Sequence, residues 1–371
     1  MGPVGEGAGP RVPRHVDELT PAWCTAALRP ARPVVAVRVR TFAEGVGMLS
    51  VMARVELTYD GDGSGPAGGD PASVVVKLPP WRERNHGMGM QWGYFVREAE
   101  FYRRLAVAAP HTPAPRCYHV GVDEADRTAV LVLADHTDAP PLDQIAGCPV
   151  PLAERIVDAA ARLHAAWWES PLLRTCRFVP ALDDGVEDRS ARLFREGFGV
   201  FAQRYRHLVP DAAFRAAERY GPQIGDRYRE WAARRPHTLM HNDLRLDNVL
   251  AVPADGPPQV LFVDWQRIIR FHGACDVAYF VAGSLTIADR RAHEEDLLRR
   301  YHDGLLAGGV RHYPLARCRQ DYRAAMLRWL GLATVASLID VANDRGERLL
   351  ATMVERHYTA AADHDVGALL D

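Results

Sequence analysis

The hydrophobic pattern of this chain changes its period near residue 150, and this change limits the folds that the chain can adopt. Before that point, short alternating or continuous apolar runs predict strands. After it, apolar residues recur at helical spacing, apart from two short apolar runs between residues 237 and 266. At 371 residues the chain is long enough for two lobes. We therefore predict an α+β protein with a β-rich lobe over residues 1–133 and a helical lobe over residues 134–371.

The individual elements follow from the same patterns. In the first lobe, helices are expected over residues 17–28 and 91–108, and strands over 33–42, 49–59, 73–78, 116–122 and 128–133. In the second lobe, helices are expected over residues 151–168, 188–206, 211–233, 289–307, 315–341 and 346–362.

The segment HNDLRLDN, residues 241–248, carries the most informative motif. Its Asp243 is followed five positions later by Asn248, and sixteen residues after that an apolar run ends in Asp264. An Asp and an Asn at this separation are typical of the catalytic loop of kinases, H-R-D-x-x-x-x-N. A second carboxylate at the end of a following strand is where a kinase places a magnesium ligand.

Phosphoryl transfer needs these residue types. One carboxylate positions and deprotonates the attacking hydroxyl, which is the role expected for Asp243. An amide oxygen and a second carboxylate hold Mg²⁺ on the phosphates of ATP, which are the roles expected for Asn248 and Asp264. Arg245 is expected to offset the charge on the transferred phosphate. Each residue alone is a weak signal, so the interpretation depends on their joint order and spacing.

Lysine occurs once in the chain, at Lys77, among 45 basic residues. A general bias toward arginine explains the composition, but it makes the single lysine informative, because an ammonium group is compact whereas a guanidinium group is a wide planar fork. Lys77 lies near the end of the strand SVVVKL, from which a kinase lysine reaches the α- and β-phosphates. We expect Glu98 to be its partner. Glu100 lies on another face of the same helix.

A glycine pair, Gly45 and Gly47, lies between the first two expected strands, where a phosphate-covering loop belongs. The third glycine of that pattern is replaced by Ser50, so contact with a nucleotide and an ordinary hairpin are equally compatible with this pair. A Walker A loop requires glycine before the lysine, and Lys77 follows Val76 instead. The sequence therefore excludes a P-loop ATPase.

Charge and cysteine content limit the partners. The chain has 47 acidic residues against 45 basic ones and no polybasic run, so neither nucleic acid nor a membrane surface is an expected partner. Its six cysteines are scattered without a C-x-x-C pair, and the apolar stretch over residues 274–288 is too short and too polar to span a bilayer. We expect a reduced, cytoplasmic protein, either a monomer or a homodimer.

Taken together, the motifs resemble the aminoglycoside phosphotransferase and CHK-kinase (ecdysteroid kinase-like) superfamily, which has the protein-kinase-like bilobal fold. The resemblance covers about residues 15–360 and depends on the motifs GVGMLSVMARVELTYD, VVVKLP, REAEFYRRLA, ARLHAAWW, HNDLRLDNVL, VDWQ and GACDVAYF. It implies ATP and Mg²⁺ as cofactors. It also implies that adenine binds the backbone of the hinge, which comprises Leu133, Ala134 and Asp135.

The resemblance also separates structural residues from reacting ones. We expect His241 to hold the catalytic loop, Asp276 to orient that loop from the start of the next helix, and His164 to pack where two helices meet. Asn242 departs from the family pattern, which often has a small residue such as glycine at this position. We expect this departure to change loop packing rather than chemistry.

The sequence leaves the acceptor open. The resemblance implies a hydroxyl on a small molecule such as an antibiotic, a sugar, an amino alcohol or a sterol-like alcohol. The mixed charge of the second lobe supports a neutral, sugar-containing or anionic acceptor at least as well as a polycationic aminoglycoside, so an aminoglycoside and a nucleoside or sugar-containing antibiotic both stay open. Antibiotic resistance or self-protection is the leading expectation. The expected acceptor wall consists of Trp265, Gln266, His272, Tyr279, Trp329, Asp340 and Asp344.

Three alternatives differ in class. A metabolic kinase for alcohols or sugars would carry the same motifs. A pseudokinase that binds nucleotide without transfer would lack one of four residues. These are Lys77, Asp243, Asn248 and Asp264, and the chain retains all of them. A protein kinase would carry D-F-G and A-P-E motifs, which do not occur at the corresponding places.

Overall fold

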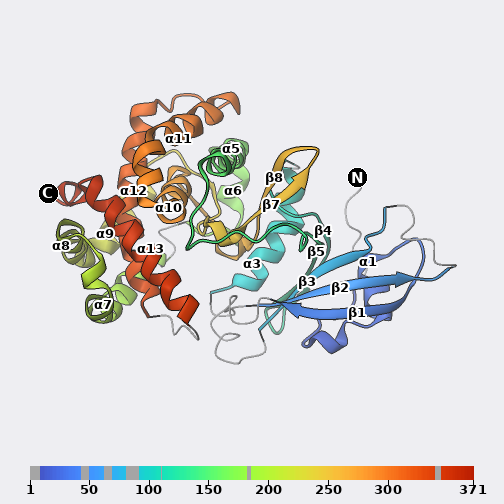
Figure 1. Ribbon diagram of the computed structural model, residues 1–371. Coiled ribbons are helices and arrows are strands. Elements are labelled where there is room, and N and C mark those ends of the chain that lie inside the picture. The colour runs from blue at the N-terminus through green and yellow to red at the C-terminus, as the bar shows by residue number, and fades with distance from the viewer. Residues whose placement is uncertain are drawn as a thin grey trace. The chain divides into compact units, whose positions relative to one another are not determined.

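The computed structural model describes residues 9–42, 50–61, 69–80, 92–109, 111–181, 185–338 and 344–371. The chain forms two compact units (Figure 1). Unit 1 comprises Met1–Pro110, Ala114–Pro140 and Asp264–Gln266, and unit 2 comprises His111–Pro113, Pro141–Val263 and Arg267–Asp371. The chain therefore returns to unit 1 for three residues, and the first of them is the carboxylate expected to bind metal.

Unit 1 contains a five-stranded antiparallel sheet in the order β1-β2-β3-β5-β4. Its strands are β1 (Val34–Phe42), β2 (Val51–Tyr59), β3 (Ser73–Leu78), β4 (Cys117–Asp123) and β5 (Thr128–Ala134). Helix α1 (Pro21–Leu28) contributes to the core on one face of the sheet. It begins at Thr20, whose hydroxyl accepts a hydrogen bond from the Trp23 N–H. The first-lobe strands predicted from the sequence are thus confirmed.

The alternation of side chains along β3 determines which face of the sheet Lys77 points to. Val74, Val76 and Leu78 lie in the core cluster that includes Cys24 of α1. Successive side chains of a strand point to opposite faces, so Lys77 points away from that cluster. Within the sheet, Lys77 pairs with Met52 on one neighbouring strand and with Leu131 on the other. Lys77 is therefore held on a central strand of the sheet.

The second helix of unit 1 contains an irregular turn. Helix α3 (Tyr94–Glu100) continues through a π-helical turn (Phe101–Leu105) into α4 (Ala106–Ala108). Glu98 is buried on α3. π-Helical turns are rare and occur frequently at functional sites. The helix predicted over 91–108 is confirmed, but it contains this widened turn, which begins shortly after Glu98, the predicted partner of Lys77.

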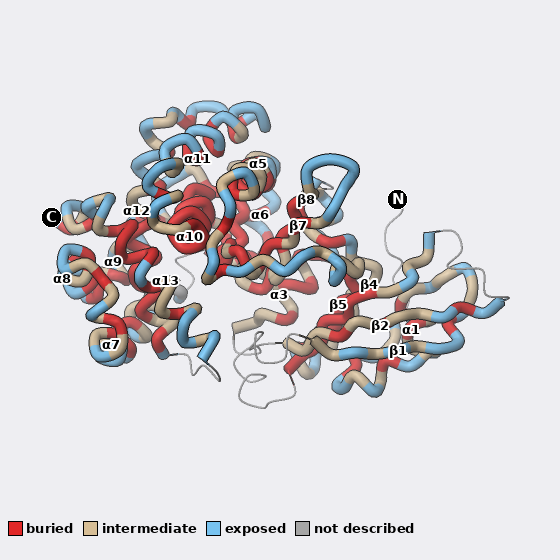
Figure 2. Tube along the Cα trace, in the orientation of Figure 1, coloured by how far each residue is buried: buried red, intermediate tan, exposed pale blue. Residues whose placement is uncertain are grey.

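Unit 2 is mainly helical. Its helices are α5 (Val150–Ala166), α6 (Pro171–Thr175), α7 (Val186–Tyr205), α8 (Asp211–Tyr220), α9 (Ile224–Ala233), α10 (Ala274–Ser284), α11 (Ile287–Ala307), α12 (Leu315–Ala336) and α13 (Asp344–Asp363). Helix α10 is its central element, since all 11 of its residues are buried (Figure 2). It packs against α5, α11, α12 and α13. A helix that is apolar on every side belongs in such a core.

Two short antiparallel strand pairs interrupt the helices; one is the hairpin predicted from the two apolar runs between residues 237 and 266, and the other was not predicted. Strand β6 (Thr238–Met240) pairs with β9 (Ile269–Phe271), and β7 (Val249–Ala254) forms a hairpin with β8 (Gly256–Phe262). The catalytic-loop motif lies between β6 and β7. The strand pairs therefore fix the backbone on both sides of that loop.

One predicted helix is wrong. The structure divides residues 211–233 into α8 and α9, which are separated by a 3₁₀ turn over Gly221–Gln223. Pro222 has no N–H to continue an α-helix. A Cβ at Gly221 would lie 2.5 Å from Cε1 of Phe194, so the turn also depends on close packing against α7. The sequence signal was present in the Gly-Pro pair.

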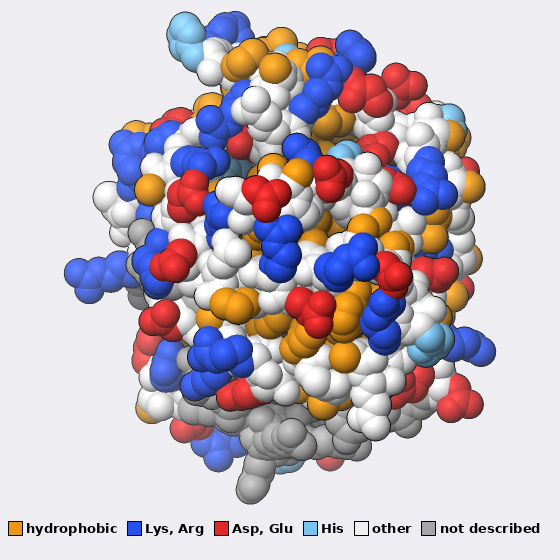
Figure 3. Space-filling view, turned by 90° about the vertical axis from the view of Figure 1, so that its left-hand side faces the viewer, with side chains coloured by type: hydrophobic (Ala, Val, Ile, Leu, Met, Phe, Trp, Pro, Cys, Tyr) orange, Lys and Arg blue, Asp and Glu red, His pale blue; other side chains and the backbone are white. Residues whose placement is uncertain are grey.

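The exposed surface agrees with the balanced composition. Basic and acidic side chains are interspersed on the face shown in Figure 3. Among the helices of the described ranges, none combines the length and the apolar character required to cross a bilayer.

Candidate active site

The first cluster of candidate residues lies in unit 1 and centres on Lys77. Its Nζ lies 2.7 Å from Oε2 of Glu98 and 2.6 Å from Oδ1 of Asp264. Strand β3, helix α3 and the segment after β8 each supply one of these three side chains. The pairing predicted between Lys77 and Glu98 is present, and the same cation binds the carboxylate expected to hold metal.

The electrostatics of this cluster keep the lysine charged. Burial disfavours the ammonium form, but the carboxylates of Asp264 and Glu98 outweigh it and raise the pKa of Lys77 above its ordinary value. Burial raises the pKa of Glu98, while the Lys77 ammonium and a backbone hydrogen bond act in the opposite direction. The buried ammonium of Lys77 therefore stays charged as long as the carboxylates of Glu98 and Asp264 both remain close to it.

Trp265 and Gln266 hold Asp264 in place. The backbone N–H of Trp265 donates to Oε1 of Glu98 (3.1 Å), and its ring stacks on Phe101 with the centroids 4.0 Å apart. Nε2 of Gln266 donates to Oδ2 of Asp264 (3.1 Å). Asp264 itself has φ of 67°, a left-handed conformation that is uncommon outside glycine and is often found at active sites. Trp265, which we expected in the acceptor wall, is fully buried in this structure.

The expected hinge ends strand β5. Leu133 and Ala134 pair with β3, and the N–H of Ala134 donates to the carbonyl of Arg116 (2.8 Å). The carboxylate of Asp135 accepts hydrogen bonds from Nε of Arg54 and Oγ of Ser73, both at 2.6 Å. Burial alone would raise the pKa of Asp135, but these bonds and two from Thr137 lower it to about 2. The Asp135 side chain therefore stabilises the end of the strand, and adenine binding by the hinge backbone stays a prediction.

The second cluster lies in unit 2 and contains Asp243, which is buried. Nδ2 of Asn248 donates to the backbone carbonyl of Asp243 (2.9 Å), and the backbone N–H of Arg245 donates to the same carbonyl (3.0 Å). The backbone carbonyl of Asn248 accepts from the N–H of Val263 (3.0 Å), the residue that directly precedes Asp264. Because the Asn248 amide nitrogen is used for the loop, its side-chain oxygen is the atom suited to bind a metal.

Arg245 is paired within the loop. Its Nη1 donates to the carboxylate of Asp247, and its Nε lies 3.9 Å from Oδ1 of Asp243. Burial would lower the pKa of Arg245, but Asp243 and Asp247 raise it. The guanidinium is thus a fixed cation beside the candidate base.

Asp276 anchors the catalytic loop from the first turn of α10. Its carboxylate accepts hydrogen bonds from the backbone N–H groups of His241 (2.7 Å) and Asn242 (2.8 Å) and lies 3.3 Å from Nε2 of His164. His241 contacts the carbonyl of Val263 through Nε2 (2.9 Å). The structural roles predicted for Asp276 and His241 are confirmed, because these contacts fix the two residues that directly precede the base.

Two arginines near the loop were not found from the sequence. Nη1 of Arg267 lies 3.8 Å from Oδ1 of Asp243. Arg328 is buried on α12, and its Nη2 donates to Oδ1 of Asn242 (2.7 Å). Arg267 lies two residues after Trp265, next to the VDWQ motif, and Arg328 interrupts the apolar run AAMLRWLGLA. An arginine inside an apolar helical run is a signal that could have been used.

The other residues predicted for the acceptor wall lie in different surroundings. Tyr279 lies with its hydroxyl 3.4 Å from Oδ1 of Asp243, and Trp329 is buried with its indole N–H donated to the carbonyl of Cys275 (2.8 Å). Asp344 begins α13. Residues Gly45, Gly47 and Asp340 lie outside the described residues.

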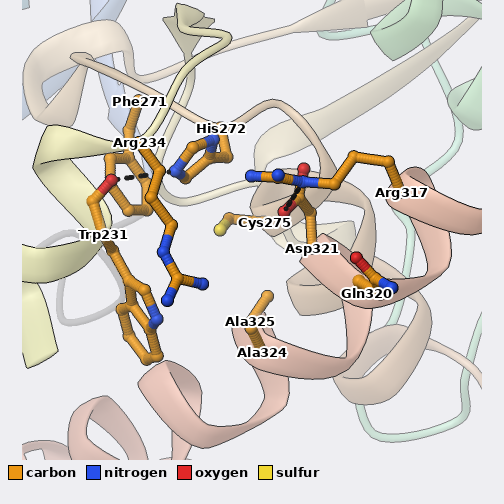
Figure 4. A pocket seen from close by; sticks show the side chains of 10 residues that line it. All are labelled: Trp231, Arg234, Phe271, His272, Cys275, Arg317, Gln320, Asp321, Ala324 and Ala325. Atoms are coloured by element: carbon orange, nitrogen blue, oxygen red, sulfur yellow. Dashed lines mark hydrogen bonds and ion pairs between the residues drawn. The ribbon is translucent and has the colours of Figure 1, made fainter. Parts of the chain in front are cut away.

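His272 is buried and lines a small cavity in unit 2 (Figure 4). Its Nδ1 lies 2.9 Å from the carbonyl of Pro236 and its Nε2 lies 3.1 Å from that of Trp231, and burial lowers its pKa. The cavity measures about 70 Å³.

The comparisons with known proteins agree with this geometry. Residues 44–309 match the model of the ecdysteroid kinase-like family, and this match covers more than half of the chain. The chain therefore belongs to the ecdysteroid kinase-like family. It is a phosphotransferase that uses an alcohol group as acceptor. No curated protein matches the chain in sequence.

Solved structures show the same fold. An ethanolamine kinase from Plasmodium vivax is similar with a TM-score of 0.51 and 14% identity over 88% of this chain and 82% of that one. A choline kinase from Cryptosporidium parvum Iowa II has a TM-score of 0.50 and 10% identity over 95% of each chain. A variant of aminoglycoside 2'-phosphotransferase IIIa in complex with GDP has a TM-score of 0.51 and 13% identity over 89% of this chain and 95% of that one. The fold is thus protein-kinase-like.

Proposed function

We propose that the chain transfers the γ-phosphate of ATP to a hydroxyl group of a small molecule. The observation that carries this proposal is the ammonium of Lys77 between the carboxylates of Glu98 and Asp264. In kinases the lysine that reaches the α- and β-phosphates is held by a helix glutamate in this way. Family membership and a similar structure that is a GDP complex support a nucleotide as the phosphate donor.

The donor atoms suit a magnesium ion. Mg²⁺ prefers hard oxygen ligands, and the chain offers the carboxylate of Asp264 and the side-chain oxygen of Asn248. A bound Mg²⁺ would neutralise charge on the phosphates. Lys77 would bind the α- and β-phosphates, so its present contact with Asp264 is one that nucleotide binding would have to loosen.

Asp243 is the proposed catalytic base. Its carboxylate accepts the proton of the acceptor hydroxyl, and Arg245 offsets charge on the transferred phosphate. Asp276 and His241 keep the loop backbone fixed, so the base does not have to be ordered at the moment of reaction.

We further propose that the acceptor is a neutral or anionic molecule, such as a sugar-containing antibiotic, and that the chain serves resistance or self-protection. Arg245 and Arg267 both lie within 4 Å of the Asp243 carboxylate. Two guanidinium groups beside the base disfavour a polycationic acceptor, because like charges repel more strongly at a partly buried site. This charge pattern favours hydroxyl-rich neutral compounds and phosphate or carboxylate esters.

The test is a screen of hydroxyl-bearing antibiotics, sugars and amino alcohols with γ-labelled ATP or GTP, read by mass spectrometry for the mass of one phosphate. Asp243→Asn is the control, because it should bind ATP with unchanged affinity in calorimetry and lose transfer by several orders of magnitude. Wild-type protein that binds ATP but phosphorylates no compound in the panel would favour a pseudokinase. Near-normal transfer by Asp243→Asn would show that the base lies elsewhere.

A further inference from the structure

The two carboxylate oxygens of Asp243 have different surroundings in unit 2. Oδ1 lies 3.4 Å from the hydroxyl of Tyr279, 3.8 Å from Nη1 of Arg267 and 3.9 Å from Nε of Arg245. Among the described residues, no donor lies within hydrogen-bonding distance of Oδ2. Within the described ranges, the carboxylate is therefore engaged through Oδ1.

Tyr279 is the neutral donor of the three, and its ring is held on both faces. Trp329 of α12 stacks on it with the centroids 4.1 Å apart and an interplanar angle of 29°, and His357 of α13 stacks on it at 5.0 Å and 17°. The indole N–H of Trp329 is bound to the Cys275 carbonyl, so this ring is fixed as well. The tyrosine cannot swing away without breaking two ring contacts.

Burial sets the protonation of this stack. It raises the pKa of the Tyr279 phenol, with a further contribution from Asp243, so the hydroxyl remains a donor. Burial also lowers the pKa of His357 to about 3, which leaves a neutral ring against Tyr279. The hydroxyl distance of 3.4 Å is long for an O–H···O bond, as is common at catalytic groups before substrate binds.

We propose that Tyr279 is a positioning residue that holds Asp243 through Oδ1 and so assigns Oδ2 to accept the proton of the acceptor hydroxyl. This inference rests on the proposed function and deepens it. In the reaction, the acceptor O–H proton moves to Oδ2 and the acceptor oxygen forms a bond to the γ-phosphorus. The bond from that phosphorus to the oxygen bridging to the β-phosphate breaks, and its electron pair leaves with ADP. The proton on Oδ2 then passes to water.

The arrangement also revises the part that Trp329 plays. We expected Trp329 to line the acceptor wall, yet its indole is buried against Tyr279. In this proposal it acts through the tyrosine and not on the acceptor. The stack thus connects α10, α12 and α13 to the orientation of one carboxylate.

The test compares Tyr279→Phe, which retains the stacked ring and removes the hydroxyl, with Tyr205→Phe. Tyr205 is a matched control, because its buried hydroxyl has no hydrogen-bond partner in the part of the chain that the structure describes. We expect Tyr279→Phe to lower kcat about tenfold, the effect of one lost hydrogen bond of about 1.4 kcal/mol, with KM for ATP unchanged.

A second measurement does not depend on the acceptor. The carboxyl ¹³C resonance of Asp243 at pH 7, assigned by its loss in Asp243→Asn, should move in Tyr279→Phe and stay in place in Tyr205→Phe. An unmoved resonance together with an unchanged kcat in Tyr279→Phe would overturn the role of Tyr279, even if Asp243→Asn abolishes transfer. If the Asp243 resonance moves in Tyr279→Phe but the wild-type protein transfers no phosphate, the contact between Tyr279 and Asp243 is supported and the proposed function is overturned.

Discussion

Lys77 and Asp264 form an ion pair across 187 residues of sequence, with Nζ and Oδ1 2.6 Å apart. The pair unites a lysine on a central strand with a carboxylate in left-handed backbone conformation, and Glu98 completes it from α3. Because these three residues belong to one compact unit, the arrangement belongs to the fold of that unit. In the proposed reaction, Lys77 gives up its contact with the Asp264 carboxylate and binds the phosphates of ATP instead.

Lys77→Arg tests whether this site requires an ammonium group. The guanidinium keeps the charge but is wider and planar, and it does not fit between two carboxylates that both lie within 2.7 Å of one nitrogen. We expect KM for ATP to rise about tenfold or more and kcat to fall. Steady-state kinetics with varied ATP measures this. Unchanged kinetics would mean that the single lysine has no special role.

Part of this site could be predicted because its signals are local. The spacing of Asp243 and Asn248 lies within one loop, and Asp264 follows directly from a strand, so neither depends on distant contacts. Lys77 was found because the chain has one lysine, which lies near the end of a short apolar strand. For Glu98, helical periodicity was enough to choose between two neighbouring glutamates. Local pattern therefore identified the chemistry.

Other features depend on tertiary packing and could not be read from local pattern. Nothing in the order of residues distinguishes a tryptophan that lines an acceptor pocket from one that is buried, and both Trp265 and Trp329 are buried. The same holds for His272, whose two ring nitrogens face backbone carbonyls. The contact of Arg328 with Asn242 joins α12 to the catalytic loop across 86 residues, and only the fold determines it.

Substitutions at Asn242 distinguish the effect of backbone strain from the effect of side-chain hydrogen bonds in the catalytic loop. Its φ is 63°, its Nδ2 donates to the carbonyl of Arg267 (3.0 Å), and its Oδ1 accepts from the buried Arg328. Asn242→Gly keeps the left-handed backbone and removes both side-chain bonds, which should lower the free energy of unfolding by about 1–3 kcal/mol. Asn242→Ala should cost about 1–2 kcal/mol more, because alanine disfavours this conformation. Urea denaturation measures both. Equal stability of the two variants would show that the backbone conformation is not strained.

The structure predicts a pH-dependent contribution from Asp135. Its pKa is lowered to about 2 in the folded chain, below the ordinary value of 3.8, so its stabilisation is present above about pH 4 and is lost as the pH falls toward 2. Asp135→Asn should lower the free energy of unfolding by about 1–2 kcal/mol at pH 7, and the difference from wild type should shrink below pH 4. Asp138→Asn is the matched control, since Asp138 is exposed and close in sequence. A difference that stays constant from pH 7 to pH 3 would contradict this role.

Asp264→Asn tests the assignment of the metal ligand. An amide retains one oxygen but loses the charge, so it binds Mg²⁺ more weakly, while Lys77 keeps Glu98 as its partner. In calorimetry, wild type should bind ATP more tightly with Mg²⁺ than with EDTA, and this gain should fall about tenfold or more in Asp264→Asn. Gln266→Ala is the control, because it removes a hydrogen bond to the same carboxylate without removing the carboxylate, and it should keep most of the gain. If Asp264→Asn retains the full magnesium-dependent gain, the metal is held by other residues and the role of Asp264 is limited to its ion pair with Lys77.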